Sequence, residues 1–201
     1  MVEPSQWMRI VEENPDHSRW YIERFKAMAD QGADIVGEAR LVDAMAPRAA
    51  RILDAGCGPG RIGGHLATVG HTVIGVDVDQ VLIDEASRVH PDATWVCADL
   101  AELDLGPELR GDGFDLIVCA GNVMTFLAPS TRRPVLAGIA AHLADSGRAV
   151  IGFGAGRGYD FDEFLADAAA SGLVTDQLLG TWDVRPFTPD SDFLVASLRR
   201  G

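Results

Sequence analysis

Residues 51–60 read RILDAGCGPG, an apolar run followed by an acid and three alternating glycines. The run predicts a buried strand from Arg51 to Asp54, and the amphipathic residues after it predict a helix from Arg61 to Val69. Glycines at the turn allow a sharp change of direction and let a ligand approach the main chain. A strand, a glycine turn and a helix in this order are typical of the opening of a nucleotide-binding βαβ unit.

Two residues of this turn bear on which nucleotide it would bind. Asp54 places a carboxylate at the tip of the strand, where it would repel an anionic ligand. Pro59 removes one backbone N–H from a loop in which a phosphate site needs donors. The turn therefore favours a cationic ligand over a pyrophosphate. A purely structural turn and an NAD(P)- or FAD-type site stay open as alternatives.

The length and charge of the chain predict one acidic α/β domain. Its 201 residues are enough for a full core. The formal charge of −13, from 30 acidic and 17 basic residues, argues against nucleic acid, whose binders usually carry a basic patch. No apolar stretch approaches the ~20 residues of a membrane span and no signal peptide is evident, so we expect a cytoplasmic protein without a membrane partner. The three cysteines lack metal-ligand spacing and are expected to be free thiols.

Helical patterns occupy residues 1–50, and strands alternate with helices after them. The expected helices of the first part cover about residues 5–13, 16–31 and 35–46. Strands are then expected at residues 51–54, 72–77, 93–97, 114–119 and 148–153, with helices at 61–69, 79–89, 130–143 and 161–170. Two closing strands are expected at residues 174–184 and 192–198. This alternation predicts a parallel sheet with helices on both faces.

Polar side chains follow several of these strands, and ligands of such sheets bind outside the carboxyl ends of the strands. Asp77 ends the second strand, 21 residues after Gly56, close to the ~20-residue spacing at which an acid accepts the ribose hydroxyls. A helix N-cap is the alternative role for Asp77, but Asp79 can take it. Asp99 and Asn122 follow the third and fourth strands. The sequence therefore predicts a ligand site at this edge of the sheet.

Residues 52–60, 75–77 and 97–100 together resemble motifs I, II and III of the class I S-adenosylmethionine-dependent methyltransferases. The resemblance spans about residues 35–200. It implies a Rossmann-like α/β fold: a seven-stranded, mostly parallel sheet of order 3-2-1-4-5-7-6 with the last strand antiparallel. It also implies a single structural domain, in which residues 1–50 form an N-terminal helical cap and residues 51–201 bind S-adenosylmethionine.

The same resemblance assigns residues to the cofactor. Asp54 would orient the methionine amino end, Asp77 would hold the ribose, and Asp99 would accept from the adenine amino group. Val78 and Leu100 would pack on the adenine ring. The residues expected to contact S-adenosylmethionine are Asp54, Ala55, Gly56, Gly58, Asp77, Val78, Asp99, Leu100 and Ala120.

Four residues are candidates for contacts with the methyl acceptor. Asn122 follows the fourth strand, in a loop without the Asn-Pro-Pro-Tyr pattern of enzymes that methylate amino groups of bases or glutamine; its alternative role is to cap a turn. Tyr21 belongs to an N-terminal helix that lies over the site in many relatives, with core packing as the alternative. Arg157 and Tyr159 lie in a glycine-rich loop that could equally be a plain connection. Trp182, near the end of the sixth strand, is a further candidate for lining an acceptor pocket, with packing in the closing hairpin as the favoured alternative.

The expected reaction is methyl transfer to a small-molecule acceptor by direct in-line displacement, with S-adenosylhomocysteine as product. No histidine stands out as a general base, and placing a nucleophile about 3–3.5 Å from the methyl group can supply much of the rate. The catalytic residues are therefore unknown, and no metal site is expected. The alternatives are methylation of tRNA or protein, non-catalytic binding of S-adenosylmethionine, and a dinucleotide-dependent oxidoreductase. The chain is expected to be a monomer or a homodimer.

Overall fold

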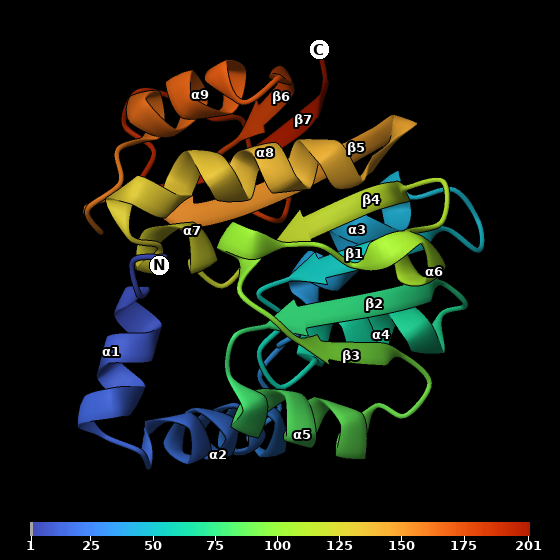
Figure 1. Ribbon diagram of the computed structural model, residues 1–201, viewed down its shortest axis with the longest axis vertical. Coiled ribbons are helices and arrows are strands. Elements are labelled where there is room, and N and C mark those ends of the chain that lie inside the picture. The colour runs from blue at the N-terminus through green and yellow to red at the C-terminus, as the bar shows by residue number, and fades with distance from the viewer. Residues whose placement is uncertain (1) are drawn as a thin grey trace.

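The computed structural model describes residues 2–201 and contains a seven-stranded sheet of order β3-β2-β1-β4-β5-β7-β6 (Figure 1). β1 to β5 run parallel to one another, and β7 runs antiparallel to both β5 and β6. The strands are β1 (Arg51–Ala55), β2 (Thr72–Asp77), β3 (Thr94–Cys97), β4 (Phe114–Cys119), β5 (Leu143–Gly154), β6 (Leu173–Leu179) and β7 (Phe193–Arg200). The expected order and the antiparallel last strand are confirmed.

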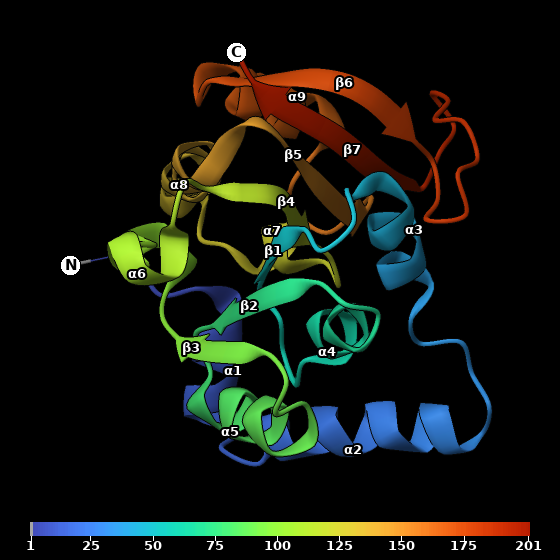
Figure 2. The same ribbon diagram turned by 90° about the vertical axis from the view of Figure 1, so that its right-hand side faces the viewer.

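Helices cover both faces of the sheet, with α8 on one face and α3 and α4 on the other (Figure 2). α1 lies beyond the carboxyl ends of β1 and β2, and α2 runs beside α5 (Figure 1). The helices are α1 (Gln6–Glu13), α2 (His17–Asp30), α3 (Gly37–Met45), α4 (Arg61–Thr68), α5 (Gln80–Val89), α6 (Gly106–Arg110), α7 (Val123–Phe126), α8 (Arg132–His142) and α9 (Phe161–Ala170), with short 3-10 turns at η1 (Leu100–Glu102) and η2 (Pro129–Thr131). Within residues 2–201, no helix is both long and apolar enough to span a membrane.

The buried side chains form two clusters, one on each face of the sheet. Leu53 and Ala55 of β1 belong to the cluster that includes residues of α8 and α9. Ile52 belongs to the cluster beneath α3 and α4. This division follows from the alternation of side chains along a strand. Because both faces of β1 are covered, the strand lies in the centre of the molecule.

The chain differs from the sequence-based expectation at its last strands and in its short helices. The sixth strand ends at Leu179 and does not continue to Val184, because the chain turns back there: Val184 has a positive φ of 64° and Leu179 bridges to Pro186. β5 begins at Leu143, directly after α8, rather than at Arg148. α6 and α7 were not expected; at five and four residues they are too short to show helical periodicity.

We expect Gly75→Ala, in the interior of the sheet, to destabilise the fold. Gly75 pairs with Trp95 across β2 and β3, and a Cβ at Gly75 would overlap the indole ring of Trp95. Overpacking of this kind typically costs about 1–3 kcal/mol. The matched control is Gly138→Ala in α8, where the nearest atoms to a new Cβ are 3.7 Å away. Urea unfolding should show a loss for the first variant and no loss for the second; equal stability of the two would contradict the packing of Trp95.

Candidate functional site

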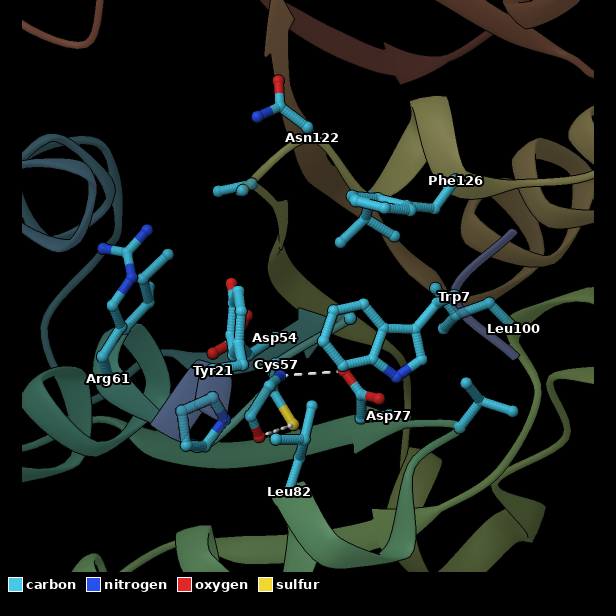
Figure 3. Close-up of a pocket in the computed structure, with 18 of the residues that line it drawn as sticks. Trp7, Tyr21, Asp54, Cys57, Arg61, Asp77, Leu82, Leu100, Asn122 and Phe126 are labelled. Carbon is cyan, nitrogen blue, oxygen red and sulfur yellow. Dashed lines mark hydrogen bonds between the residues drawn. The ribbon is translucent and has the colours of Figure 1, made fainter. Parts of the chain in front are cut away.

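A cavity of about 510 Å³ opens at the carboxyl ends of β1, β2 and β4, where the sequence predicted a ligand site. The α1 and α2 helices contribute to its wall from outside the sheet. Figure 3 shows Asp54, Cys57 and Asp77 at the sheet side of this cavity, with Tyr21 and Trp7 close to them. The expected residues that line it are Asp54, Gly56, Gly58, Asp77, Val78, Asp99, Leu100, Ala120, Tyr21, Asn122 and Arg157.

The glycine turn after β1 has the backbone that the sequence predicted. Gly56, Gly58 and Gly60 all have positive φ, at 79°, 54° and 84°. The backbone N–H groups of Gly56 and Cys57 both donate to the carbonyl oxygen of Val76, at 2.8 and 3.0 Å. These bonds hold the turn against the end of β2. At Gly56 a Cβ would overlap the side chain of Val123, so this position requires glycine.

Asp54 lies beneath the turn and is only 1% exposed. Its Oδ2 accepts a hydrogen bond of 2.8 Å from the backbone N–H of Gly63, in the first turn of α4. Burial raises the pKa of Asp54 to about 7, although the bond from Gly63 acts in the opposite direction. Near neutral pH this carboxyl therefore exists in both protonation states, and a cation placed beside it would favour the ionised one.

Asp77 connects the end of β2 to the glycine turn. Its Oδ2 accepts from the backbone N–H of Gly58 at 2.9 Å, and its Oδ1 accepts from the N–H of Asp79 at 3.0 Å. Asp79, in turn, caps α5 by accepting from Val81 at 2.9 Å, which is the N-cap role expected of it. Burial raises the pKa of Asp77 to about 6, against the lowering effect of these backbone bonds. Asp54, which is buried, and Asp77, which is half-buried, thus form a pair of acids at one end of the cavity.

The third strand contributes residues to the same end. Asp99 accepts a hydrogen bond of 2.9 Å from the N–H of Ala101 and so begins the short turn η1. Leu100, the first residue of that turn, is 6% exposed and lines the cavity. Ala55 differs from the expectation. It is fully buried in the core cluster toward α8 and does not line the cavity, because side chains alternate along β1 and Asp54 takes the other face.

The N-terminal helices cover the cavity with aromatic side chains. Trp7 of α1 donates a hydrogen bond of 2.9 Å from Nε1 to Oδ2 of Asp79. Its ring packs edge-to-face on Tyr21 of α2, at a centroid distance of 5.2 Å, and on Phe126 of α7, at 5.9 Å (Figure 3). Burial raises the pKa of the Tyr21 phenol, which therefore keeps its proton near neutral pH. Trp7 was not predicted, since α1 shows no sequence signal that ties it to strand tips 70 residues away.

An ion pair closes the wall between α3 and α4. Arg61 donates from Nη2 to Oε1 of Glu38 at 2.6 Å and from Nη1 to the carbonyl oxygen of Ile35 at 2.6 Å. Burial acts to raise the pKa of Glu38, but the hydrogen bonds and charge of Arg61 outweigh it and lower that pKa. Both side chains line the cavity, yet each charge already has its partner.

The loops after β4 and β5 form the opposite end of the cavity. Asn122 has a positive φ of 66°, and its Oδ1 accepts a hydrogen bond of 2.9 Å from the backbone N–H of Gly154. Arg157, Trp182 and Phe193 line the cavity beside it. The Asn122 side chain therefore ties this turn to the end of β5 and also lines the cavity; it makes no capping bond within its own turn.

Tyr159 does not belong to the site. It is 1% exposed, its hydroxyl donates to Oδ2 of Asp167 at 2.9 Å, and the guanidinium of Arg132 lies 3.9 Å from the centre of its ring. Its ring also stacks on Phe153. The expected acceptor contact from Tyr159 is therefore wrong: α9 and α8 bury the residue in the core.

Comparisons with known proteins agree with this geometry. Residues 52–147 match a family described as a methyltransferase domain. A crystal structure of a TehB-like S-adenosylmethionine-dependent methyltransferase from Corynebacterium glutamicum is 52% identical, with a TM-score of 0.89 over 94% of this chain and 100% of that one. The sugar N-methyltransferase KedS8 from Streptoalloteichus sp. shares the fold at 20% identity and a TM-score of 0.67, over 90% of this chain and 93% of that one.

A curated relative matches a shorter segment. The biotin biosynthesis bifunctional protein BioHC of Cellvibrio japonicus is 44% identical over 54 residues, which are 26% of this chain and 11% of that protein. The match to the Corynebacterium structure, in contrast, spans nearly the whole chain. With the sheet order and the glycine turn already described, it shows that this chain belongs to the S-adenosylmethionine-dependent methyltransferases of the class I, Rossmann-like fold.

Proposed function

We propose that this methyltransferase transfers the methyl group of S-adenosylmethionine directly to a small-molecule acceptor. The observation that carries the proposal is the division of the cavity into two ends. One end holds the acids Asp54 and Asp77 beside the glycine turn, and the other holds Asn122 and Arg157 beyond the tip of β4. A cofactor at the acidic end would present its methyl group toward the second end.

The residues at the acidic end fit a cationic nucleoside. Asp77 would accept the two ribose hydroxyls, and Asp99 would accept from the adenine amino group. Val78 and Leu100 would pack on the ring, and Gly56 and Gly58 let the cofactor approach the main chain. Asp54 would face the ammonium group of the methionine part, which its negative charge would attract. S-adenosylmethionine would supply the methyl group, and its sulfonium sulfur would keep the electron pair of the broken S–CH3 bond and leave as the neutral thioether S-adenosylhomocysteine.

The cover over the cavity supports a small acceptor. Trp7 packs on both Tyr21 and Phe126 beside the cavity, whose volume of about 510 Å³ must hold cofactor and acceptor together. The net charge of −13 disfavours tRNA. KedS8, which shares the fold, is itself a sugar N-methyltransferase. A small organic acceptor therefore fits better than a nucleic acid or a protein.

The cavity offers positioning rather than proton transfer. No histidine lines it in the part of the chain that the structure describes, and the raised pKa of Tyr21 keeps the phenol protonated. In-line placement of a nucleophile can contribute about 7–11 kcal/mol to lowering a barrier. We propose that transfer relies on this placement, with Asn122 and Tyr21 orienting the acceptor.

The decisive test combines binding with turnover. Calorimetric titration with S-adenosylmethionine and S-adenosylhomocysteine should show saturable binding of both. A panel of small acceptors, bulk tRNA and protein should then give S-adenosylhomocysteine only with small molecules. Turnover with only tRNA or protein would show that the acceptor is a macromolecule. Binding of S-adenosylmethionine without any turnover would indicate a sensor. Saturable NAD(P)H binding would overturn the proposal. The oligomeric state and the cytoplasmic location stay predictions.

A further inference from the structure

We propose that the acceptor is a small organic anion, with a flat apolar body and a carboxylate or phosphate that Arg157 binds. This inference rests on the proposed function and names the chemical class of the acceptor. Its evidence lies at the end of the cavity away from Asp77, where Figure 3 places Asn122. Four side chains make up this acceptor subsite: Asn122, Arg157, Trp182 and Phe193.

Two glycines of β5 form the floor of the acceptor subsite. Gly152 and Gly154 are two residues apart, so both present the same face of the strand. A Cβ at Gly152 would overlap the indole of Trp182, and a Cβ at Gly154 would lie 3.2 Å from Nε of Arg157 and 3.7 Å from Cδ2 of Phe193. The bare strand thus lets an indole and a guanidinium lie side by side against the sheet. This arrangement presents an aromatic surface next to a positive charge.

The guanidinium of Arg157 has no partner among the described residues. Among residues 2–201, Arg157 forms no ion pair and donates no hydrogen bond, whereas most arginines of the chain do one or the other. Arg157 is an exposed residue that lines the cavity, so its unpaired guanidinium is open to a ligand there. Guanidinium groups bind carboxylate and phosphate in a two-pronged geometry.

Asn122 adds a second donor to the acceptor subsite. Its Oδ1 is taken by the N–H of Gly154, at 2.9 Å. Its amide nitrogen has no partner among the described residues and is free to donate to a ligand in the cavity that Asn122 lines. Arg157 and Asn122 together therefore offer a positive charge and several N–H donors, which suits an anion better than a cationic acceptor.

The other charged groups of the cavity place the anion at this end. Asp54, Asp77 and Asp99 line the cofactor end and would repel it. Arg61 is paired with Glu38. Arg24 also lines the cavity, but its guanidinium packs on the rings of Trp20 and Phe25, at 5.8 and 6.0 Å. Arg157 is thus the cation best placed to meet an acceptor beyond the tip of β4.

The test uses three small probes that share one ring. Benzoate, phenyl phosphate and the neutral benzamide are titrated calorimetrically into the protein saturated with S-adenosylhomocysteine. We expect at least one of the anions to bind ten times or more as tightly as benzamide, since charge-assisted hydrogen bonds are about twice as strong as neutral ones. The better of the two anions identifies carboxylate or phosphate as the recognised group.

Variants assign the preference to Arg157. Arg157→Ala should lose the preference for the anion over benzamide, by about 10- to 100-fold, while its affinity for S-adenosylhomocysteine stays unchanged. Arg148→Ala is the matched control, because Arg148 is an exposed arginine of the same strand region that does not line the cavity. Arg157→Lys should recover only part of the preference, because lysine cannot bind in a two-pronged manner.

Two results would overturn the assignment. Equal or undetectable binding of all three probes would show that the site does not select anions. An unchanged preference for the anion in Arg157→Ala would show that Arg157 is not the group that binds it. Both are distinct from a failure of the proposed function, which would show first as absent binding of S-adenosylhomocysteine itself.

Discussion

Asp77→Ala should weaken the binding of S-adenosylmethionine by at least about 100-fold. Two hydrogen bonds from ribose hydroxyls to a carboxylate are worth about 1.5–3 kcal/mol each, and the variant loses both. It also frees the N–H groups of Gly58 and Asp79, which donate to this carboxylate at 2.9 and 3.0 Å and fix the turn in place. Calorimetry with S-adenosylmethionine and S-adenosylhomocysteine measures the loss.

Controls separate a lost contact from a lost fold. Asp92→Ala removes an exposed acid outside the cavity and should leave both affinities unchanged. Asp77→Asn keeps an oxygen for the N–H of Gly58 but has no charge, so we expect an affinity between those of the wild type and Asp77→Ala. Wild-type affinity in Asp77→Ala, with thermal unfolding unaltered, would show that Asp77 does not hold the ribose.

The cofactor end of the cavity could be predicted from sequence because its determinants are local. The glycine turn needs only consecutive residues, and the positive φ values of Gly56, Gly58 and Gly60 follow from that spacing. Asp77 was found by its distance along the chain, because strand, helix and strand of a βαβ unit have a nearly fixed length. The sheet order came from the family resemblance and was confirmed by the pairing of β1 with β2 and β4.

The rest of the site depends on contacts between distant segments, for which the sequence carries no periodic signal. Trp7 reaches Asp79 across 72 residues. Trp182, expected in a strand of the closing hairpin, instead leaves the sheet after Leu179 and folds back over Gly152. For Tyr159 the sequence predicted a site residue that the structure does not place in the site. Its glycine-rich loop suggested a contact with the acceptor, but its hydroxyl donates to Asp167 on α9 and its ring is buried.

Affinity for S-adenosylmethionine should rise steeply between pH 5 and pH 8, because the two carboxyls of Asp54 and Asp77, whose pKa values are raised, must ionise to bind it. The pKa values of about 7 for Asp54 and about 6 for Asp77 mean that both are largely protonated at pH 5 in the free protein. If binding requires both charges, the affinity at pH 5 is lower by on the order of a thousandfold than at pH 8. Binding near pH 6.5 should also release protons, which calorimetry in buffers of different ionisation enthalpy detects.

Asp54→Asn isolates the contribution of the more deeply buried acid. The amide can still accept the N–H of Gly63, and the remaining titration of Asp77 leaves only about a tenfold change between pH 5 and pH 7. The free protein should show the opposite trend. A carboxyl whose folded pKa lies above its unfolded value stabilises the fold at low pH and loses that stabilisation as pH rises through the folded pKa. The unliganded wild type should therefore lose stability relative to Asp54→Asn between about pH 4 and pH 8, while the cofactor complex gains it. A pH-independent affinity would show that the cofactor does not use these two charges.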